Sequence, residues 1–236
     1  MSVQIKIAEL QKSLAGLSAR DVIAAIVKDA FPGRVAVACS FGTEGAALLH
    51  LVASVDTATP VLFIDTGRHF EETLNYRDAL AAYFRLTDVR SIGPTPEETA
   101  RLDPDQTRAT WDPGGCCAFR KVVPLKKALD GFDAWITGLM PFQARTRGAL
   151  TLLEADGPRV KVNPLASWTE QDLDSYDRDH GLPSHPLVAQ GYLSIGCAPC
   201  TTPVKPGEDV RAGRWRGQEK TECGIHLPLA VEADVQ

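Results

Sequence analysis

Short apolar runs alternate with segments of helical periodicity along most of the chain. Five runs have the length and composition of buried strands, because β-branched and aromatic residues dominate them and turn residues bound them. They span residues 35–39, 60–64, 87–92, 134–138 and 159–165. The last run alternates apolar and polar positions, so we expect it to lie near an edge of the sheet.

Helices are predicted between these runs, at residues 18–27, 46–51, 70–84, 119–129 and 167–181. Helix starts are predicted at Ser18 and Thr95, and a capping box is predicted from Ser167 to Glu170. Alternating strands and helices predict an α/β fold, with a mainly parallel, doubly wound sheet and helices on both faces. Such sheets bind ligands at the carboxyl ends of their strands.

The periodic pattern fades after about residue 201, where proline and glycine become frequent. We therefore expect residues 1–200 to form the α/β domain and residues 201–236 to form a flexible C-terminal tail. A chain of 236 residues is long enough for one well-packed domain with such a tail.

Composition narrows the classes of protein. The chain is 44% hydrophobic and 23% charged, which is ordinary for a globular protein, and its net charge of −5 argues against nucleic-acid binding. The N-terminus lacks the pattern of a signal peptide, and no apolar run is long enough to span a membrane. These features predict a cytoplasmic protein with reduced thiols, so its six cysteines are expected to be ligands or catalysts rather than disulfides.

Four of the cysteines form two close pairs, Cys116 with Cys117 and Cys197 with Cys200. Two such pairs can reach different irons of an iron–sulfur cluster, whereas a zinc site usually spaces such ligands by two to four residues. The spacing therefore favours an iron–sulfur cluster over zinc, with buried metal-free thiols as a third interpretation. Cys39 lies within an apolar strand, and we interpret it as a packing residue.

Cys223 stands apart from these pairs, in the sequence Glu222-Cys223-Gly224-Ile225-His226. Gly224 permits close approach of a second molecule, and a neighbouring histidine or arginine would favour the thiolate, whereas Glu222 would oppose it. A nucleophilic role is one interpretation of this cysteine, and a thiol without special chemistry is the other.

Two loops at predicted strand ends suit a nucleotide. Residues 40–45 (Ser-Phe-Gly-Thr-Glu-Gly) place backbone N–H groups and a helix N-terminus after the first strand, although they are not a Walker A loop. Residues 65–67 (Asp-Thr-Gly) end the next strand at the same edge, where an aspartate suits donor groups of a purine or ribose. An ordinary glycine-containing turn and a helix cap are the alternative interpretations. Two such loops at one edge favour a nucleotide site.

Together these residues resemble the assimilatory adenylyl-sulfate reductases, the iron–sulfur branch of the phosphoadenylyl-sulfate reductase family, over about residues 35–227. The most specific part is the order of motifs: Cys-Cys, 79 residues, C-x-x-C, 22 residues, and then Glu-Cys-Gly-Ile-His-Leu. Residues 116–125 also match the family pattern Cys-Cys-x-x-Arg-Lys-x-x-Pro-Leu. The resemblance implies a fold like that of the adenine nucleotide alpha hydrolases.

The resemblance implies thioredoxin-dependent reduction of adenosine 5′-phosphosulfate to sulfite and AMP, in sulfate assimilation and cysteine biosynthesis. Cys223, on a catalytic tail, would become an S-sulfocysteine, with Lys121 and His226 as further catalytic residues. A [4Fe–4S] cluster would be held by Cys116, Cys117, Cys197 and Cys200. The residues implied in substrate binding are Ser40, Gly42, Glu44, Asp65, Gly67, Arg147, Arg211 and Arg214.

One loop departs from the family pattern. The family usually has a basic loop of the type Gly-Leu-Arg-Arg-x-Gln-Ser, whereas residues 138–147 here are Gly-Leu-Met-Pro-Phe-Gln-Ala-Arg-Thr-Arg. The two early cations are missing, and we expect Arg145 and Arg147 to compensate. The lower charge predicts weaker substrate binding.

Three alternatives are left open by the sequence. A reductase of the 3′-phosphorylated substrate, or of both substrates, would share the fold, but enzymes restricted to that substrate generally lack the four cluster cysteines. An iron–sulfur tRNA-thiolating enzyme would need a Ser-Gly-Gly-x-Asp-Ser loop and a basic surface. A zinc-stabilised interaction module would be colourless and would not need Cys223. The sequence does not fix the oligomeric state, and a homo-oligomer is compatible with it.

Overall fold

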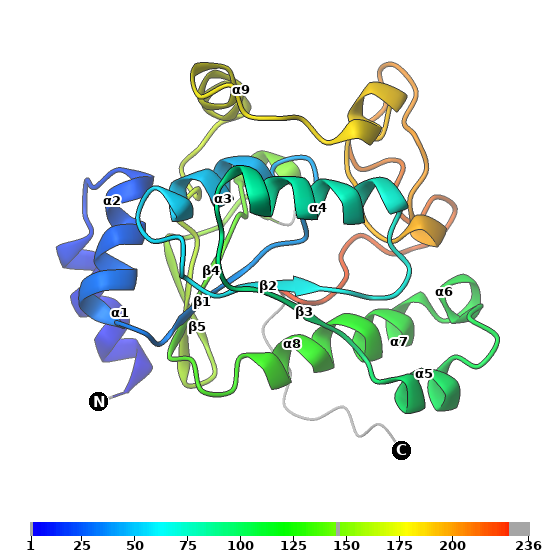
Figure 1. Ribbon diagram of the computed structural model, residues 1–236, viewed down its shortest axis with the longest axis horizontal. Coiled ribbons are helices and arrows are strands. Elements are labelled where there is room, and N and C mark those ends of the chain that lie inside the picture. The colour runs from blue at the N-terminus through cyan, green and yellow to red at the C-terminus, as the bar shows by residue number, and fades with distance from the viewer. Residues whose placement is uncertain (1, 145–146, 227–236) are drawn as a thin grey trace.

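A mainly parallel sheet forms the centre of the fold (Figure 1). The computed structural model describes residues 2–144 and 147–226. Within these residues the six strands have the order β3-β2-β1-β4-β6-β5, and every neighbouring pair is parallel except β5 with β6. The strands are β1 (Val35–Ala38), β2 (Val61–Ile64), β3 (Val89–Ile92), β4 (Ala134–Thr137), β5 (Leu153–Asp156) and β6 (Arg159–Val162). The predicted α/β class and the five predicted strands are confirmed.

The edge strand β5 has no strand pattern in its sequence, because Leu-Glu-Ala-Asp contains neither a β-branched nor an aromatic residue. A tight turn creates it: Gly157 adopts φ 57°, in the left-handed region, and the chain returns antiparallel as β6. As a result β6, which was expected near an edge, lies one strand in from it, and β5 covers it.

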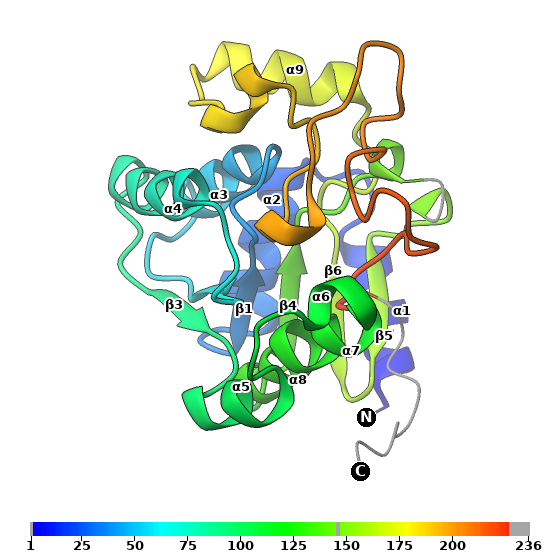
Figure 2. The ribbon, with the colours of Figure 1, turned by 90° about the vertical axis from the view of Figure 1, so that its right-hand side faces the viewer.

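Helices cover both faces of the sheet (Figures 1 and 2). One face carries α1 (Val3–Ser13), α2 (Ala19–Ala24) with its π-helical continuation η1 (Ala25–Ala30), α3 (Gly45–Ala53) and α4 (Glu71–Tyr83). The other side carries α5 (Pro96–Leu102), α6 (Arg108–Trp111), α7 (Pro113–Cys117), η2 (Ala118–Val122) and α8 (Val123–Ala128). The remaining elements are η3 (Pro141–Gln143), α9 (Glu170–Asp179), η5 (Pro186–Gln190) and η6 (Ala198–Cys200).

Alternation along the strands divides the apolar core into two layers. Val37 of β1 packs with Leu49 of α3 in the larger cluster. Its neighbour Ala36 packs with Trp135 and with Leu125 of α8 in the cluster on the opposite face. Burying a side chain such as Leu49, which is fully buried, stabilises the fold by about 1.5–3 kcal/mol. These two layers fix the strand ends on which the site depends.

Two of the predicted helix starts are confirmed and one is wrong by two residues. Ser18 caps α2, and Thr95 forms the capping box of α5. The helix α9 begins with a capping box between Thr169 and Asp172 rather than at Ser167. The aspartate carboxylate accepts the Thr169 N–H at 2.8 Å, a role that the usual capping pattern gives to glutamate or glutamine.

After η6 the chain folds back across the carboxyl edge of the sheet (Figure 2). Between residues 201 and 226 it has no helix or strand apart from an isolated bridge between Thr201 and Arg214. Trp215, which is 3% exposed, anchors this segment. The division into a domain and a flexible tail stays a prediction, and residues 227–236 lie outside the described part. None of the described helices combines the length and apolarity that a membrane span requires.

Candidate active site

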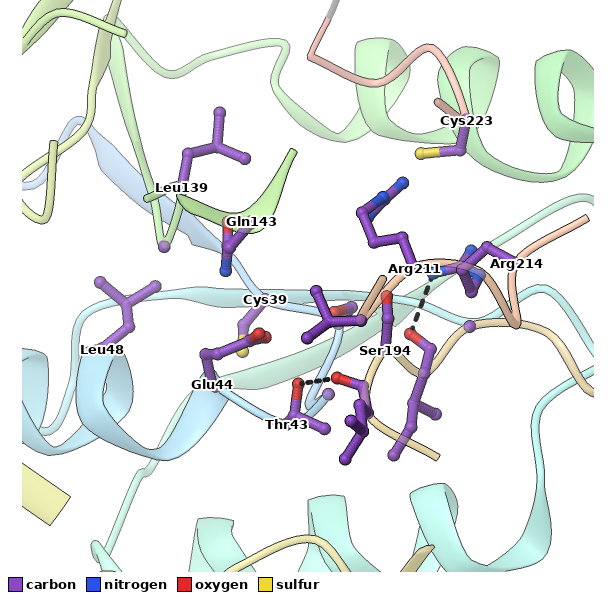
Figure 3. Close-up of a pocket in the computed structure, with 18 of the residues that line it drawn as sticks. Cys39, Thr43, Glu44, Leu48, Leu139, Gln143, Ser194, Arg211, Arg214 and Cys223 are labelled. Carbon is purple, nitrogen blue, oxygen red and sulfur yellow. Dashed lines mark hydrogen bonds between the residues drawn. The ribbon is translucent and has the colours of Figure 1, made fainter. Parts of the chain in front are cut away.

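The carboxyl ends of the parallel strands open into one cavity of about 460 Å³. A volume of this size is typical of pockets for small molecules. Its walls come from the loops after β1 and β4, from α9, from residues 193–196 and from the C-terminal tail. Figure 3 shows Cys223, Arg211 and Arg214 on one side and Glu44, Leu48 and Leu139 on another. The predicted site residues that line it are Ser40, Gly42, Glu44, Lys121, Arg147, Arg211, Arg214, Cys223 and His226.

The loop after β1 is shaped by two buried side chains. Phe41 adopts φ 51°, which is rare for a bulky residue, and is fully buried with its ring edge-on to Phe63 at 5.6 Å. Its N–H donates to Cys39 Sγ at 3.4 Å, and burial raises the pKa of Cys39 to about 12. A Cβ on Gly45 would lie 3.3 Å from that sulfur. The packing role expected for Cys39 is thus to fold this loop against the start of α3.

The loop after β2 contributes less to the cavity than predicted. Asp65 Oδ1 accepts the N–H of Gly67 at 2.9 Å, and Gly67 has φ 65°. Asp65 therefore caps its own turn, and neither residue is among the cavity-lining residues that the structure describes. His69 does line the cavity, with Nε2 against the Ile64 carbonyl oxygen at 2.9 Å.

The four paired cysteines come from two segments that are far apart in the sequence. Cys116 and Cys117 end α7, while Cys197 caps η6 and Cys200 ends it. The preceding helix α6 packs against η6, and Cys200 packs on the cluster that contains Cys116 and Phe119. All four are free thiols, and Cys200 is the most exposed of them. The fold thus brings together the residues that the sequence predicted to be ligands.

These thiols lie close enough to influence one another's charge. Burial raises the pKa of Cys117 to about 11, and it also raises the pKa of Cys116 and of Cys200. Burial acts in the same direction on Cys197, but Lys121 and a hydrogen bond with Thr66 outweigh it and lower the pKa of Cys197. Across residues 2–144 and 147–226, no group of three or more His, Cys, Asp or Glu side chains is arranged to hold a metal ion.

Lys121, on η2, connects the cysteine pairs with the cavity that it lines. Burial alone would lower its pKa, but the nearby thiols of Cys197, Cys223 and Cys117 outweigh burial and raise it. The ammonium group therefore stays charged in a desolvated place, where it acts on Cys223 and on both cysteine pairs.

Glu222, beside Cys223, holds two arginines from different segments. Its carboxylate lies 3.0 Å from Arg147 and 3.3 Å from Arg211, and none of the three side chains is more than 17% exposed. Gln143 Oε1 accepts from Arg147 Nη1 and from the Met140 N–H. Gln143 thus fixes Arg147 in the loop that lacks the two early cations. Arg145, expected to compensate for them, lies outside the described residues.

Arg214 reaches the cavity past a glycine. A Cβ on Gly196 would lie 2.3 Å from Arg214 Nη2, so a side chain at that position would displace the guanidinium. Arg214 Nη1 donates to the Ile195 carbonyl at 3.4 Å, and the guanidinium lies 4.5 Å from the Trp215 ring. Its Nε is buried without a hydrogen-bond partner in the described part of the chain, and burial lowers the pKa of Arg214.

The two residues that follow Gly224 pack against the apolar cluster around Trp135. Ile225 packs with Leu125 and Trp135, and the His226 ring stacks on Trp135 with 6.0 Å between centroids and 6° between planes. Burial lowers the pKa of His226 well below its ordinary value, so the imidazole is neutral. His226 therefore anchors the end of the tail on Trp135, in addition to the catalytic role predicted for it.

The wall away from the arginines is acidic. Glu44, Asp174 and Asp177 line it, the last two from α9. Burial, with Asp174 and Glu44 nearby, raises the pKa of Asp177 to about 6. The cavity thus has a cationic side and an anionic side, which suits a ligand with an anionic end and hydrogen-bond donors at the other end.

A buried ion pair connects these elements. Arg120 Nη2 lies 2.8 Å from Asp103, and the two side chains are 3% and 4% exposed. Arg120 Nη1 also donates to the Thr66 carbonyl at 2.7 Å, and Thr66 Oγ1 lies 3.3 Å from Cys197 Sγ. The end of α5, the π-helix η2, the end of β2 and the C-x-x-C segment are therefore held by one set of contacts.

No role was predicted from the sequence for Gln143 or for the acids of α9. Gln143 is the glutamine of the family loop pattern Gly-Leu-Arg-Arg-x-Gln-Ser, whereas the α9 acids lie on a predicted helix without a site motif, and packing brings them to the cavity. Gly196 had a usable signal, since a glycine directly before a C-x-x-C pair indicates a close approach at that point.

Comparison with known sequences identifies relatives over most of the chain. Residues 34–203 match the model of the phosphoadenosine phosphosulfate reductase domain. Adenosine 5′-phosphosulfate reductase of Mesorhizobium japonicum is 49% identical over 225 residues, covering 95% of this chain and 89% of that protein. The protein of that name from Mycobacterium tuberculosis is 46% identical over 186 residues, covering 77% of this chain and 72% of that protein.

Solved structures show the same fold. The phosphate complex of phosphoadenylyl-sulfate reductase from Candida auris matches with a TM-score of 0.72 and 26% identity, covering 86% of this chain and 98% of that one. FMN adenylyltransferase of Candida glabrata matches with a TM-score of 0.55 and 16% identity, covering 92% and 76%, which is a likeness of fold alone.

Replacing Asp103 with asparagine should lower the free energy of unfolding by about 3–5 kcal/mol, because the Arg120 guanidinium would stay buried without its counter-charge. Urea denaturation measures the change. The exposed Asp105→Asn is the matched control and should stay within about 0.5 kcal/mol of the parent chain.

The same pair should make stability depend on acid. Burial opposes the charge of Asp103, but hydrogen bonds from Arg120 and Arg108 outweigh it and hold the pKa of Asp103 below its ordinary value. A pKa depressed by folding stabilises the protein above the unfolded value, and this stabilisation is lost as the pH falls. The difference in the free energy of unfolding between the parent protein and Asp103→Asn should therefore shrink below about pH 4. A difference that stays constant on acidification would contradict this account.

Proposed function

The chain belongs to the phosphoadenosine phosphosulfate reductase family, and we propose that it reduces adenosine 5′-phosphosulfate to sulfite and AMP. The observation that carries the proposal is the placement of Cys223, which lines the same cavity as Lys121, Arg147, Arg211 and Arg214. Relatives 49% and 46% identical to this chain carry the name adenosine 5′-phosphosulfate reductase, which supports that substrate.

The charges of the cavity suit the two ends of this substrate. The phosphosulfate would lie on the cationic side, and the nucleoside would extend toward the loop of Ser40 and Gly42 and the acidic wall. Carboxylates there accept hydrogen bonds from hydroxyl and amino groups. A further phosphate on the ribose would meet Glu44 and the α9 acids unfavourably, which favours the substrate without a 3′-phosphate.

The first chemical step is attack by the Cys223 thiolate on the sulfur of the sulfate group. An S–S bond forms while the S–O bond to the AMP phosphate breaks, and AMP leaves with the electron pair. Cys223 becomes an S-sulfocysteine. Lys121 and the arginines would offset the repulsion between thiolate and substrate, and the charge that develops on the departing oxygen.

The second step requires a dithiol reductant, for which we propose thioredoxin or a similar protein. One of its thiolates attacks Cys223 Sγ, and sulfite leaves with the electron pair of the S–S bond. The second thiol resolves the mixed disulfide and restores the Cys223 thiolate, so two electrons pass from dithiol to sulfur. Because Cys223 has to meet both a nucleotide and a protein, the tail would move between the steps. The reaction belongs to sulfate assimilation and cysteine biosynthesis, in the cytoplasm.

The four paired cysteines suit a [4Fe–4S] cluster as donors. They are free thiols from two packed segments, and Phe119 and Ala109 pack with Cys116 and Cys200. When bound, the cluster would supply an electrostatic field at the cationic side of the cavity. Lys121 would couple this part of the protein to the substrate, since it interacts with both cysteine pairs and with Cys223.

Purified protein should release sulfite from adenosine 5′-phosphosulfate in the presence of thioredoxin, and much less from the 3′-phosphorylated nucleotide. Sulfite determination with both substrates measures this. Equal or reversed preference would keep the mechanism but refute the role given to the acidic wall. No sulfite from either substrate would overturn the proposed function.

Cys223→Ser should abolish sulfite release and leave the iron content and brown colour unchanged, because Cys223 is the proposed nucleophile and not a ligand. Cys197→Ser, at the cap of η6, should lose iron as well as activity. Iron and sulfide analysis with visible absorbance separates the two variants. One equivalent of zinc without sulfide in the parent protein would refute the cluster.

Lys121→Ala should lower kcat/KM by about 10²–10³-fold, since it removes a desolvated cation from the reacting groups. The exposed Lys126→Ala, on the following helical turn, is the control and should keep the parent rate. Near-normal turnover in Lys121→Ala, with normal circular dichroism, would exclude the proposed role.

A further inference from the structure

The carboxylate of Glu222 occupies two of the guanidinium groups that the proposed reaction needs. It accepts from Arg147 Nε at 3.1 Å and Nη2 at 3.2 Å, and from Arg211 Nη2 at 3.3 Å. The Nε–Nη2 edge of arginine is a planar fork that matches an oxyanion with two parallel hydrogen bonds. Glu222 therefore sits where an anionic group of a ligand would make its best contact with Arg147.

Two further hydrogen bonds hold these arginines in place. Arg147 Nη1 donates to Gln143, and Arg211 Nη2 also donates to the Thr221 carbonyl at 2.7 Å. The partners of Arg147 and Arg211 thus include the two residues directly before Cys223. The same contacts therefore place the Cys223 thiol and hold the two arginines.

A second contact holds the chain on the other side of the thiol, where Ile225 and His226 pack on Trp135. Between the two contacts lies Gly224, with φ 95°, a conformation open to glycine but strained for other residues. Gly224 therefore separates the ionic contact from the apolar one along the chain.

We propose that Glu222 is a positioning residue for Cys223, and that its carboxylate holds the place of the substrate's anionic group on Arg147 and Arg211. The Nε–Nη2 edge of Arg147 either holds Glu222, which docks the thiol, or binds the nucleotide. An arriving phosphosulfate or phosphate therefore displaces Glu222 and loosens the tail at Cys223. This inference rests on the proposed function and adds the regulation of the same site. The alternative is that Glu222 only orients the two arginines.

Substitution of Glu222 separates these two roles. If the carboxylate competes with the nucleotide, Glu222→Gln should bind AMP about three- to tenfold more tightly in calorimetric titration, and the KM for adenosine 5′-phosphosulfate should fall. The kcat should fall about tenfold, because the thiol is docked less often. A residue that only stabilised the fold would not move affinity and kcat in opposite directions. The control is Glu219→Gln, an exposed glutamate three residues earlier, which should change neither.

Alkylation of Cys223 by iodoacetamide, followed by mass spectrometry of its peptide, tests the exchange in the parent protein. AMP should accelerate alkylation several-fold, and Glu222→Gln should react at the faster rate without AMP. This measurement decides the question even if Glu222→Gln folds poorly.

The inference is overturned if Glu222→Gln binds AMP no more tightly than the parent, or if AMP slows alkylation of Cys223. A parent protein that releases sulfite but shows either result loses only this inference. A parent protein that neither binds AMP nor releases sulfite loses the proposed function and this inference together.

Discussion

Like charges have to meet in this cavity, and the rest of the structure depends on how that repulsion is offset. A thiolate on the tail is to approach an anionic nucleotide, so cations must already be held, desolvated, at the meeting point. Lys121 comes from η2, Arg147 from the region after β4, and Arg211 and Arg214 from the tail. Their assembly requires the α/β sheet to align its carboxyl ends and requires the tail to fold back over them.

Burying a cation without a partner costs free energy of folding, and the cations of this protein differ in the groups that lie beside them. Arg120 is neutralised by Asp103, and its Nη1 donates to the Thr66 carbonyl at the end of β2, so its role is to hold these segments together. Lys121 lies near the thiols of Cys197, Cys223 and Cys117, which raise its pKa, and Arg214 lies beside Trp215 in a space that Gly196 leaves open. Among the described ion pairs neither Lys121 nor Arg214 has a carboxylate partner, and both line the cavity. On η2, the neighbours Arg120 and Lys121 thus differ in role: Arg120 holds the surrounding segments together, and Lys121 lines the cavity.

More of the fold than of the candidate site could be predicted from the sequence. Buried strands, helix caps and the order of cysteine motifs depend on local patterns, and these were sufficient for five of the six described strands and for the cysteine pairs that pack together. The strand β5 was not predictable from its composition, since a turn and a neighbouring strand create it. Asp65 shows what a local pattern leaves out: its Oδ1 accepts the Gly67 N–H and so shapes its own turn, and its role in substrate binding stays a prediction. Gln143 had a signal in the loop pattern of the family, whereas the acids of α9 had none, because only tertiary packing brings them to the cavity.

Charge balance would account for the glutamate next to Cys223, the proposed nucleophile. In its docked position the tail brings Arg211 and Arg214 to the cavity, together with Glu222 and Cys223. With the thiol ionised these groups cancel, so docking of the reactive form changes the net charge of the cavity little. Lys121 and Arg147, on the main domain, are left to balance the two negative charges of a phosphosulfate. Without the carboxylate, the docked tail would carry excess positive charge and would hold an anionic product more tightly, which slows its release. In the proposed mechanism, the sequence Glu-Cys would therefore keep the affinity of the site low enough for turnover while keeping the cations that the attack requires.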